Sequence, residues 1–196
     1  MADSQLLSWE DAVRWLLEQP DQAELARAAY FDQPTSVSAR RYHESAEFAE
    51  LRRYLPKRPG RALDLGAGNG ILAFALAKDG WQVTAVEPDP SDLIGAGAIR
   101  QLSRDTGVAI DVVEAFGEAI PLEAANYDLV IARQVLHHAH EIGQFCREMA
   151  RLTRPGGLVI TLRDHVISGP SQLPAFFEKH PLHHLYGGEN AFEIGQ

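Results

Sequence analysis

The chain has 196 residues, of which 45% are hydrophobic, with 18 Lys and Arg against 27 Asp and Glu and a formal net charge of −9. This length and composition predict one domain with a hydrophobic core of ordinary size. Because nucleic-acid affinity depends on cations that replace the counterions of the backbone, an acidic chain without a Lys/Arg cluster is not expected to bind DNA or RNA.

The first residues, MADSQLLSWEDAVRWL, carry acidic groups where a signal peptide would carry basic ones. No apolar run reaches the roughly 20 residues that span a bilayer, so we expect no membrane partner. Cys146 is the only cysteine and cannot form an internal disulfide. These features predict a cytoplasmic protein in a reducing compartment.

Two helices are expected first in the chain. Ser8 and Asp11 have the spacing of a capping box, and Asp21 and Glu24 repeat it. Pro20 separates the two helices, since proline interrupts a continuing helix.

A third helix is expected from about Ser38 to Leu55, because Phe48, Leu51 and Leu55 fall on one stripe. We expect residues 1–58 to form a helical lid over a cleft in the following domain. Packing between helices is the simpler expectation for any single residue of this segment. The candidates to cover a substrate are Tyr30, Phe31, Arg41 and Tyr42.

From Arg61 onward, short β-rich runs alternate with helical ones. Such alternation predicts an α/β fold with a doubly wound, mainly parallel sheet in residues 59–165. Residues 166–196 would add a C-terminal helix and tail to the same domain. The predicted strands are ALDL, WQVTAVE, VAIDVVE, YDLVIA and LVITLR.

Two of the intervening helices have clear patterns. The segment from Ile71 to Lys78 is apolar nearly all round, as expected for a helix pressed against a sheet, and Gly80 closes it. A second helix has one apolar stripe, on which Cys146 would be a small core residue rather than a nucleophile. The members of this stripe are Ile142, Phe145, Cys146, Met149 and Leu152.

The segment LDLGAGNG joins the first strand to the first crossover helix, where ligands bind in such sheets. Its glycines at 66, 68 and 70 allow a sharp turn and a close approach of the backbone to a ligand. Glu87, at the end of the second strand, can accept two hydrogen bonds from a ribose diol. The glycines alone would indicate only a tight turn, whereas the pair with Glu87 predicts a nucleoside cofactor.

The same loop argues against a dinucleotide. The dinucleotide fingerprint needs a third Gly or Ala at the position that Ile71 fills. Asp64 would repel a diphosphate and attract a cationic ammonium or sulfonium group. A nicotinamide-dependent oxidoreductase is therefore the less favoured alternative.

The motifs LDLGAGNG, VEPD, YDLVIARQVLHH and RLTRPGGLVI together resemble those of the class I S-adenosylmethionine-dependent methyltransferases. The resemblance covers about Ser38 to Arg163. Within this class the chain is most similar to small bacterial methyltransferase-like proteins that carry an Arg-acid-His-Val run and a HPLHxLYGGE segment. The resemblance implies S-adenosyl-L-methionine as the cofactor.

The resemblance also implies a role for residues in the motifs. The glycine loop would hold the methionine moiety, with Asp64 at its ammonium group. Glu87 would bind the ribose, and Pro88 would lie against the adenine. The residues expected at the cofactor are Asp64, Gly66, Ala67, Gly68, Gly70, Glu87, Pro88, Phe116, Gly117 and Arg133.

Phe116 departs from the family pattern, which often has an Asp there that contacts the adenine amino group. Two arrangements remain open. Either Phe116 stacks on the ring while the Gly117 N–H donates to a ring nitrogen, or Glu114 or Glu118 makes the polar contact.

Methyl transfer from a sulfonium is an in-line displacement, so the protein mainly aligns the acceptor and, for a hydroxyl or thiol, removes a proton. His165 after the fifth strand and His137 or His138 after the fourth are candidate bases, with structural roles as the simpler expectation. Arg163 would suit a substrate carboxylate or phosphate. We expect no metal, because neither HExxH nor a cysteine–histidine pattern occurs.

The sequence thus predicts an S-adenosylmethionine-dependent methyltransferase with a small-molecule acceptor. A cofactor-binding or regulatory module without turnover is the main alternative. After the fourth strand the chain lacks the Asn/Asp-Pro-Pro-aromatic run that grips a planar base nitrogen. Oxygen, nitrogen, sulfur and carbon acceptors of a metabolite all remain open.

The C-terminal end raises a further expectation. Class I members usually finish with a sixth and a seventh strand, and the sequence after Arg163 has no two alternating runs to form them. The run LVITLR would then be an exposed apolar edge, which natural proteins normally cover. We expect either a shortened form of a longer protein or a homodimer in which a partner chain covers this edge.

Overall fold

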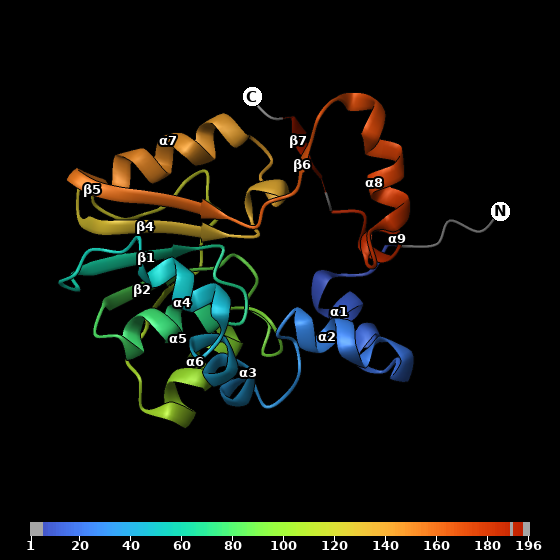
Figure 1. The fold of residues 1–196 in the computed structure, drawn as a ribbon, viewed down its shortest axis with the longest axis horizontal. Helices are drawn as coiled ribbons and strands as arrows, with labels where there is room; N and C mark the ends of the chain where they lie inside the picture. The colour runs from blue at the N-terminus through green and yellow to red at the C-terminus, as the bar shows by residue number, and fades with distance from the viewer. Residues whose placement is uncertain (1–5, 189, 194–196) are drawn as a thin grey trace.

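The computed structural model describes residues 6–188 and 190–193. Its centre is a parallel sheet of five strands in the order β3-β2-β1-β4-β5 (Figure 1). Each strand overlaps one of the five predicted runs, so the predicted α/β class is confirmed. The strands are β1 (Arg61–Leu65), β2 (Gln82–Val86), β3 (Asp111–Val113), β4 (Tyr127–Arg133) and β5 (Thr153–Leu162).

Helices cover both faces of the sheet, as Figure 1 shows. Alternate residues of a strand point to opposite faces. Leu129 and Ile131 of β4 pack in the cluster that contains α5 and α6, whereas Val130 and Ala132 pack with α7. The sheet is therefore doubly wound, as predicted. The three helices are α5 (Ile71–Lys78), α6 (Ala96–Thr106) and α7 (Ile142–Leu152).

The apolar stripe predicted for α7 included one residue, Cys146, that does not belong to it. Phe145, Met149 and Leu152 are buried against the sheet, but Cys146 is exposed, so its predicted place in the core is wrong. Successive residues of a helix are turned by about 100° from one another. Because Phe145 takes the inward direction, Cys146 faces solvent.

The first N-terminal cap is confirmed and the second is wrong. Helix α1 (Trp9–Leu17) begins after Ser8, whose Oγ accepts the Asp11 N–H at 3.1 Å. Asp21 instead lies within a short 3₁₀ helix, η1 (Pro20–Gln22), and α2 (Ala23–Ala28) has no side-chain cap from any described residue. Proline at the start of η1 sets a tighter turn before α2.

The expected third helix is divided into α3 (Thr35–His43) and α4 (Ala46–Arg52). Ser45 has extended backbone, and its Oγ accepts the Phe48 N–H at 3.1 Å, so a new helix starts there. Tyr42 of α3 and Phe48 of α4 are both fully buried in the cluster that covers the α5 face of the sheet. These two helices are therefore part of the sheet-covering layer.

The C-terminal segment lies beside the N-terminal helices rather than along the sheet (Figure 1). Leu182 of this segment packs with Val13 of α1 and Ala26 of α2. Among the described residues, no strand pairs with the outer edge of β5, in agreement with the expected lack of a terminal hairpin. The segment contains β6 (Val166–Ile167), η3 (Pro170–Gln172), α8 (Leu173–Lys179), α9 (His183–Tyr186) and β7 (Phe192–Glu193), with β6 and β7 forming a separate two-stranded sheet.

Candidate active site

The loop after β1 turns sharply because its glycines adopt left-handed backbone, with φ of +67° at Gly66 and +54° at Gly68. The two residues serve different ends. A Cβ on Gly66 would collide with the Val135 side chain, whereas a Cβ on Gly68 would have the Ile94 carbonyl oxygen as its nearest neighbour, at 3.8 Å. Gly66 therefore has to be small because the Val135 side chain packs against it. Gly68 keeps the space in front of the loop open.

Glu87 follows β2 and holds this loop. Its Oε2 accepts the Gly68 N–H at 2.7 Å, and its Oε1 accepts the Asp89 N–H at 2.9 Å. Burial raises the pKa of Glu87 to about 7, while these two N–H donors oppose the rise. The carboxylate is thereby oriented at the edge of the space that Gly68 leaves open.

Asp64, the last acidic residue before the loop, is only 1% exposed. Its Oδ2 has no hydrogen-bond partner among the described residues. Burial raises the pKa of Asp64 to about 7, against the smaller opposing effects of the Ala73 N–H and the Arg133 charge. A buried polar atom normally has a partner, so this oxygen marks a position where a donor belongs.

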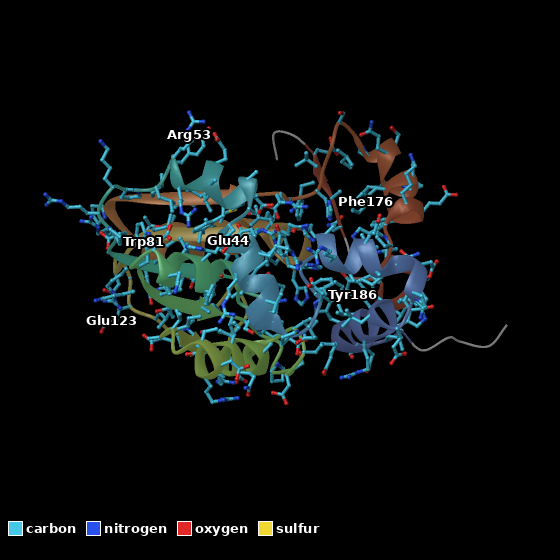
Figure 2. All side chains as sticks on the ribbon, turned by 60° about the horizontal axis from the view of Figure 1, so that its bottom comes forward. Glu44, Arg53, Trp81, Glu123, Phe176 and Tyr186 are labelled. Carbon is cyan, nitrogen blue, oxygen red and sulfur yellow. The ribbon has the colours of Figure 1, made fainter. Side chains whose placement is uncertain are left out.

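These groups line a cavity of about 310 Å³, which we name the central pocket. Its floor is the glycine loop with Asp64, Glu87 and Pro88, and its opposite wall comes from elements far away in the sequence. Trp9 and Tyr186 meet there with ring centroids 4.7 Å apart; Figure 2 shows Tyr186 on the segment beside the N-terminal helices. Other residues that line the pocket are Ala29, Phe31, Arg133, Gln134, Val135 and His138.

A smaller cavity of about 130 Å³, the rim pocket, shares Gly66, Pro88, Val135 and His138 with the central pocket. Phe116 lines this pocket and is 61% exposed, and its ring centroid lies 5.9 Å from that of His140. The two carboxylates nearby have partners in the protein. Glu114 pairs with Arg100 at 2.7 Å, and Glu118 accepts the His140 N–H at 2.8 Å.

A third cavity, also of about 130 Å³, adjoins the central pocket, and we name it the histidine chamber. It shares Trp9, Phe31, Gln134 and His138 with the central pocket. The other residues that line it are Leu16, Leu25, His137, His165, His180, Pro181 and Leu182.

Asp164 orders the wall of the histidine chamber. Its Oδ1 accepts the backbone N–H groups of Val135 and Leu136, at 3.0 and 2.8 Å. The same oxygen lies 3.5 Å from Nδ1 of His137, whose side chain is 4% exposed. The Asp164 carboxylate, which follows β5, thus fixes the loop after β4 and lies next to the His137 ring.

The structure brings most of the expected cofactor residues together and separates others. Gly70 is the N-cap residue of α5, and a Cβ there would press against the Ile99 side chain, so this glycine serves packing. Arg163 lines a different surface, an apolar groove between α4 and β5, and its Nη1 binds Glu47 Oε2 at 2.7 Å. Arg133 lines the central pocket and binds the same carboxylate, with Nε 2.6 Å from Oε1.

Of the four residues expected to cover a substrate, one lines the cavities and three pack elsewhere. Phe31 lines both the central pocket and the histidine chamber. Tyr42 is fully buried, Arg41 pairs with Asp32, and the Tyr30 carbonyl accepts the Asn69 side-chain N–H at 2.8 Å. These three residues pack between elements, which was the simpler expectation.

Sequence reasoning missed Trp9 and Tyr186, which line the central pocket, whereas Gln134 lines it as expected of a residue after the fourth strand. The HPLHHLYGG segment was noticed as a motif, yet nothing in the sequence indicated that it would meet the N-terminal helix. In the described part of the chain, no three or more His, Cys, Asp or Glu side chains are grouped so as to hold a metal ion. Among the same residues, no helix has the length and apolarity needed to cross a membrane.

Known proteins resemble the part of the chain that carries this site. Residues 63–161 match the family described as "Methyltransferase domain". A ubiquinone biosynthesis O-methyltransferase from Methylocella silvestris is 40% identical over 99 residues, which are 50% of this chain and 38% of that protein. An uncharacterized methyltransferase from Mycolicibacterium paratuberculosis is 36% identical over 133 residues, 67% of this chain and 48% of that protein.

The fold is also known from solved structures. The YcgJ protein from Bacillus subtilis aligns with a TM-score of 0.65 at 17% identity, over 75% of this chain and 62% of that chain. This likeness shows the fold. The chain spans about half or less of the length of the two curated relatives named above.

Proposed function

The chain belongs to the class I S-adenosylmethionine-dependent methyltransferase family, and from this premise we propose that it transfers a methyl group from S-adenosyl-L-methionine to a small-molecule acceptor. The observation that carries the proposal is the buried Asp64 Oδ2 at the floor of the central pocket, which has no hydrogen-bond partner within the described part of the chain. An ammonium group supplies both the hydrogen-bond donors and the positive charge that this oxygen requires.

The other residues of the central pocket fit the rest of the cofactor. The Glu87 carboxylate, held by two backbone N–H groups, has further lone pairs for ribose hydroxyls. Gly68 leaves room for the methionine moiety. Because Glu114 and Glu118 have partners in the protein, stacking by Phe116 is the favoured contact with the adenine.

When bound, the cofactor supplies an electrophilic methyl group on a sulfonium. The chain's own residues would orient it, exclude water and receive a proton from the acceptor. We propose that α1, α2 and the C-terminal segment form the lid, since Trp9, Phe31 and Tyr186 line the wall opposite the glycine loop. His137 and His165 stay candidates for the base because both line the adjoining chamber.

Arg163 now has a different proposed role. Its partner Glu47 lies on α4, and the groove that it lines is not shared with the central pocket. We infer that Arg163 ties β5 to α4.

The exposed β5 edge supports a homodimer, since Val159 on this strand is 43% exposed and Tyr54 beside it is 67% exposed.

Isothermal titration calorimetry with S-adenosylmethionine, S-adenosylhomocysteine, NAD and NADP tests the proposal. We expect the first two to bind and the dinucleotides not to bind. Binding of NAD in place of S-adenosylhomocysteine would contradict the proposal. Cofactor binding without methyl transfer to any small molecule would favour the module without turnover.

A further inference from the structure

Residues 29–34, which we name the hinge, join α2 of the proposed lid to α3 of the sheet-covering layer (Figure 1). Neighbouring residues of the hinge face different surroundings. Ala29 and Phe31 line the central pocket, whereas the Tyr30 ring packs edge-on against Tyr42 of α3, with 5.3 Å between centroids. The backbone at Tyr30 therefore decides whether Phe31 reaches the pocket.

Tyr30 has a backbone conformation that a bulky residue disfavours. Its φ of +62° lies in the left-handed region, where the Cβ of an L-residue crowds the following carbonyl oxygen. Such a conformation persists only where the surrounding structure holds it in place. The hinge therefore depends on contacts from neighbouring elements.

Arg41 of α3 holds the hinge from one side. Its Nη2 donates to the Arg27 carbonyl oxygen at 2.7 Å, and its Nη1 donates to Asp32 Oδ2, also at 2.7 Å. Its Cζ lies 4.9 Å from the centroid of the Tyr30 ring, within the range of a cation–π contact. One guanidinium thus spans both sides of the turn, but these contacts do not involve the glycine loop.

Asn69 holds the hinge from the side of the glycine loop. This residue is 6% exposed and lines the central pocket. Its Nδ2 donates to the Tyr30 carbonyl oxygen at 2.8 Å, across 39 positions of the chain. Unlike Gly68 and Gly70 on either side of it, Asn69 does not have positive φ, so the turn of the loop does not itself require this residue. The amide is accounted for by its bond to the hinge.

The two segments that this bond joins both line the central pocket. The glycine loop forms the floor, while Phe31 and Trp9 belong to the wall, with ring centroids 5.9 Å apart and planes at 79°. A ligand that rests on the loop and under the wall benefits from any contact that keeps the two together. By linkage, a contact that favours the closed wall also favours the bound ligand.

Resting on the proposed methyl transfer, we propose that Asn69 is a positioning residue that couples the cofactor loop to the lid. Its hydrogen bond to the Tyr30 carbonyl fixes Phe31 in the wall of the central pocket and thereby slows release of the cofactor. Because the wall has to open before the ligand leaves, loss of the bond should raise the dissociation rate constant and leave the association rate constant nearly unchanged.

Two variants of Asn69 test the proposal by stopped-flow binding of S-adenosylhomocysteine. Asn69→Ala removes the amide, and Asn69→Asp keeps its shape but replaces the donor with a carboxylate oxygen. We expect each to raise the dissociation rate constant at least about threefold, in the range of one hydrogen bond. The added charge of Asn69→Asp would attract the ammonium group of the ligand and slow its release, so faster release in both variants cannot come from charge.

Tryptophan fluorescence, to which Trp9 in the pocket wall contributes, follows both rate constants. Asn126→Asp is the matched control, because Asn126 precedes β4 at the end of the strand away from the loop that follows it. This variant should release the ligand at the rate of the parent. An unchanged dissociation rate constant in both Asn69 variants would overturn the proposal.

A double-mutant cycle separates action through the hinge from direct contact with the ligand. In a Phe31→Ala background, Asn69→Ala should change the dissociation rate constant by less than about twofold, because the group that the hydrogen bond positions is already absent. Effects of the same size in both backgrounds would show that Asn69 contacts the ligand directly, which would overturn the proposal.

Hydrogen exchange of the protein without cofactor observes the hinge itself. The Phe31 N–H donates to the Ala26 carbonyl oxygen at 2.9 Å. We expect residues 26–33 to exchange faster in Asn69→Ala than in the parent, with residues 35–43 unchanged. Unaltered exchange in residues 26–33 would overturn the proposal.

Circular dichroism melts establish that each variant is folded. If S-adenosylhomocysteine binds the parent and the Asn69 variants release it at the same rate, the coupling proposal alone fails. If it does not bind the parent, the proposed function fails, and the coupling to cofactor release fails with it.

Discussion

The Oε2 atom of Glu87 accepts the backbone N–H of Gly68 at 2.7 Å, so the acid after β2 holds the loop after β1. The carboxylate that is expected to bind the ribose therefore also shapes the loop that is expected to hold the methionine moiety. Loss of Glu87 should act on the cofactor through both contacts.

We predict that Glu87→Ala weakens S-adenosylhomocysteine binding by about 1.5–3 kcal/mol, the usual loss for a hydrogen bond to a charged group. The measurement is calorimetric titration of the folded variant. Glu114→Ala is the control. Glu114 follows the neighbouring strand β3 and pairs with Arg100 of α6, so its replacement should leave the affinity unchanged. Equal affinities of parent and Glu87→Ala would place the ribose elsewhere.

A matched pair of glycine variants separates packing from binding. Both Gly66 and Gly68 have positive φ, so a valine at either position has a similar backbone cost. Gly66→Val should also collide with Val135 and lower the melting temperature strongly, whereas Gly68→Val should stay folded and lose S-adenosylhomocysteine binding. Undiminished binding in Gly68→Val would contradict the assignment of the loop.

The two raised carboxyls predict the pH dependence of stability. The pKa of Asp64 and that of Glu87 are each raised to about 7 by burial, whereas the unfolded chain ionises such groups at about pH 4. Between these values the folded state binds more protons than the unfolded state. The free energy of unfolding therefore falls as pH rises through this window, by up to about 1.4 kcal/mol per pH unit for each group.

Asp64→Asn should remove its share of this slope and raise the melting temperature at about pH 7.5 more than at about pH 5. Groups with a lowered pKa, such as Glu47 and Asp79, lose their contribution only below about pH 4 and do not oppose the slope. Thermal melts at the two pH values check the prediction, with Asp105→Asn on the exposed face of α6 as the control. A stability slope that Asp64→Asn leaves unchanged would contradict it.

Glu47 joins two arginines from neighbouring strands, and the variants on the two sides should differ. Glu47→Gln leaves Arg133, whose side chain is 10% exposed, without its carboxylate and should lower stability by about 2 kcal/mol or more. Arg163 is 44% exposed in its ion pair, so Arg163→Ala should cost about 1 kcal/mol or less and leave S-adenosylhomocysteine affinity unchanged. Urea unfolding measures the stability of the variants, and calorimetry measures their affinity for S-adenosylhomocysteine. A loss of this affinity in Arg163→Ala would show that Arg163 acts at the cofactor site.

Periodicity and spacing predicted the sheet and the floor of the site because both depend on short-range patterns. The five strands and the helix from Ile71 to Lys78 follow from runs of adjacent residues. Prediction from such patterns has a limit even within one segment. The apolar stripe predicted a single helix, whereas the N-cap at Ser45 divides it into α3 and α4. The wall formed by Trp9 and Tyr186 could not be predicted, since a contact between two ends of a chain leaves no pattern in either segment.

The outer edge of β5 gives the last prediction. Among the described residues no strand pairs with this edge, and it borders a groove lined by Leu51, Tyr54 and residues 158–163. Exposed apolar strand edges favour pairing with another chain, so light scattering should show a dimer at micromolar concentration. Val159→Lys should yield a monomer, because a charge at this edge blocks edge-to-edge pairing. Val166→Lys, at a residue that is 60% exposed on β6, is the control and should stay dimeric. A parent chain that stays monomeric and non-aggregating at all concentrations would show that the β5 edge needs no second copy.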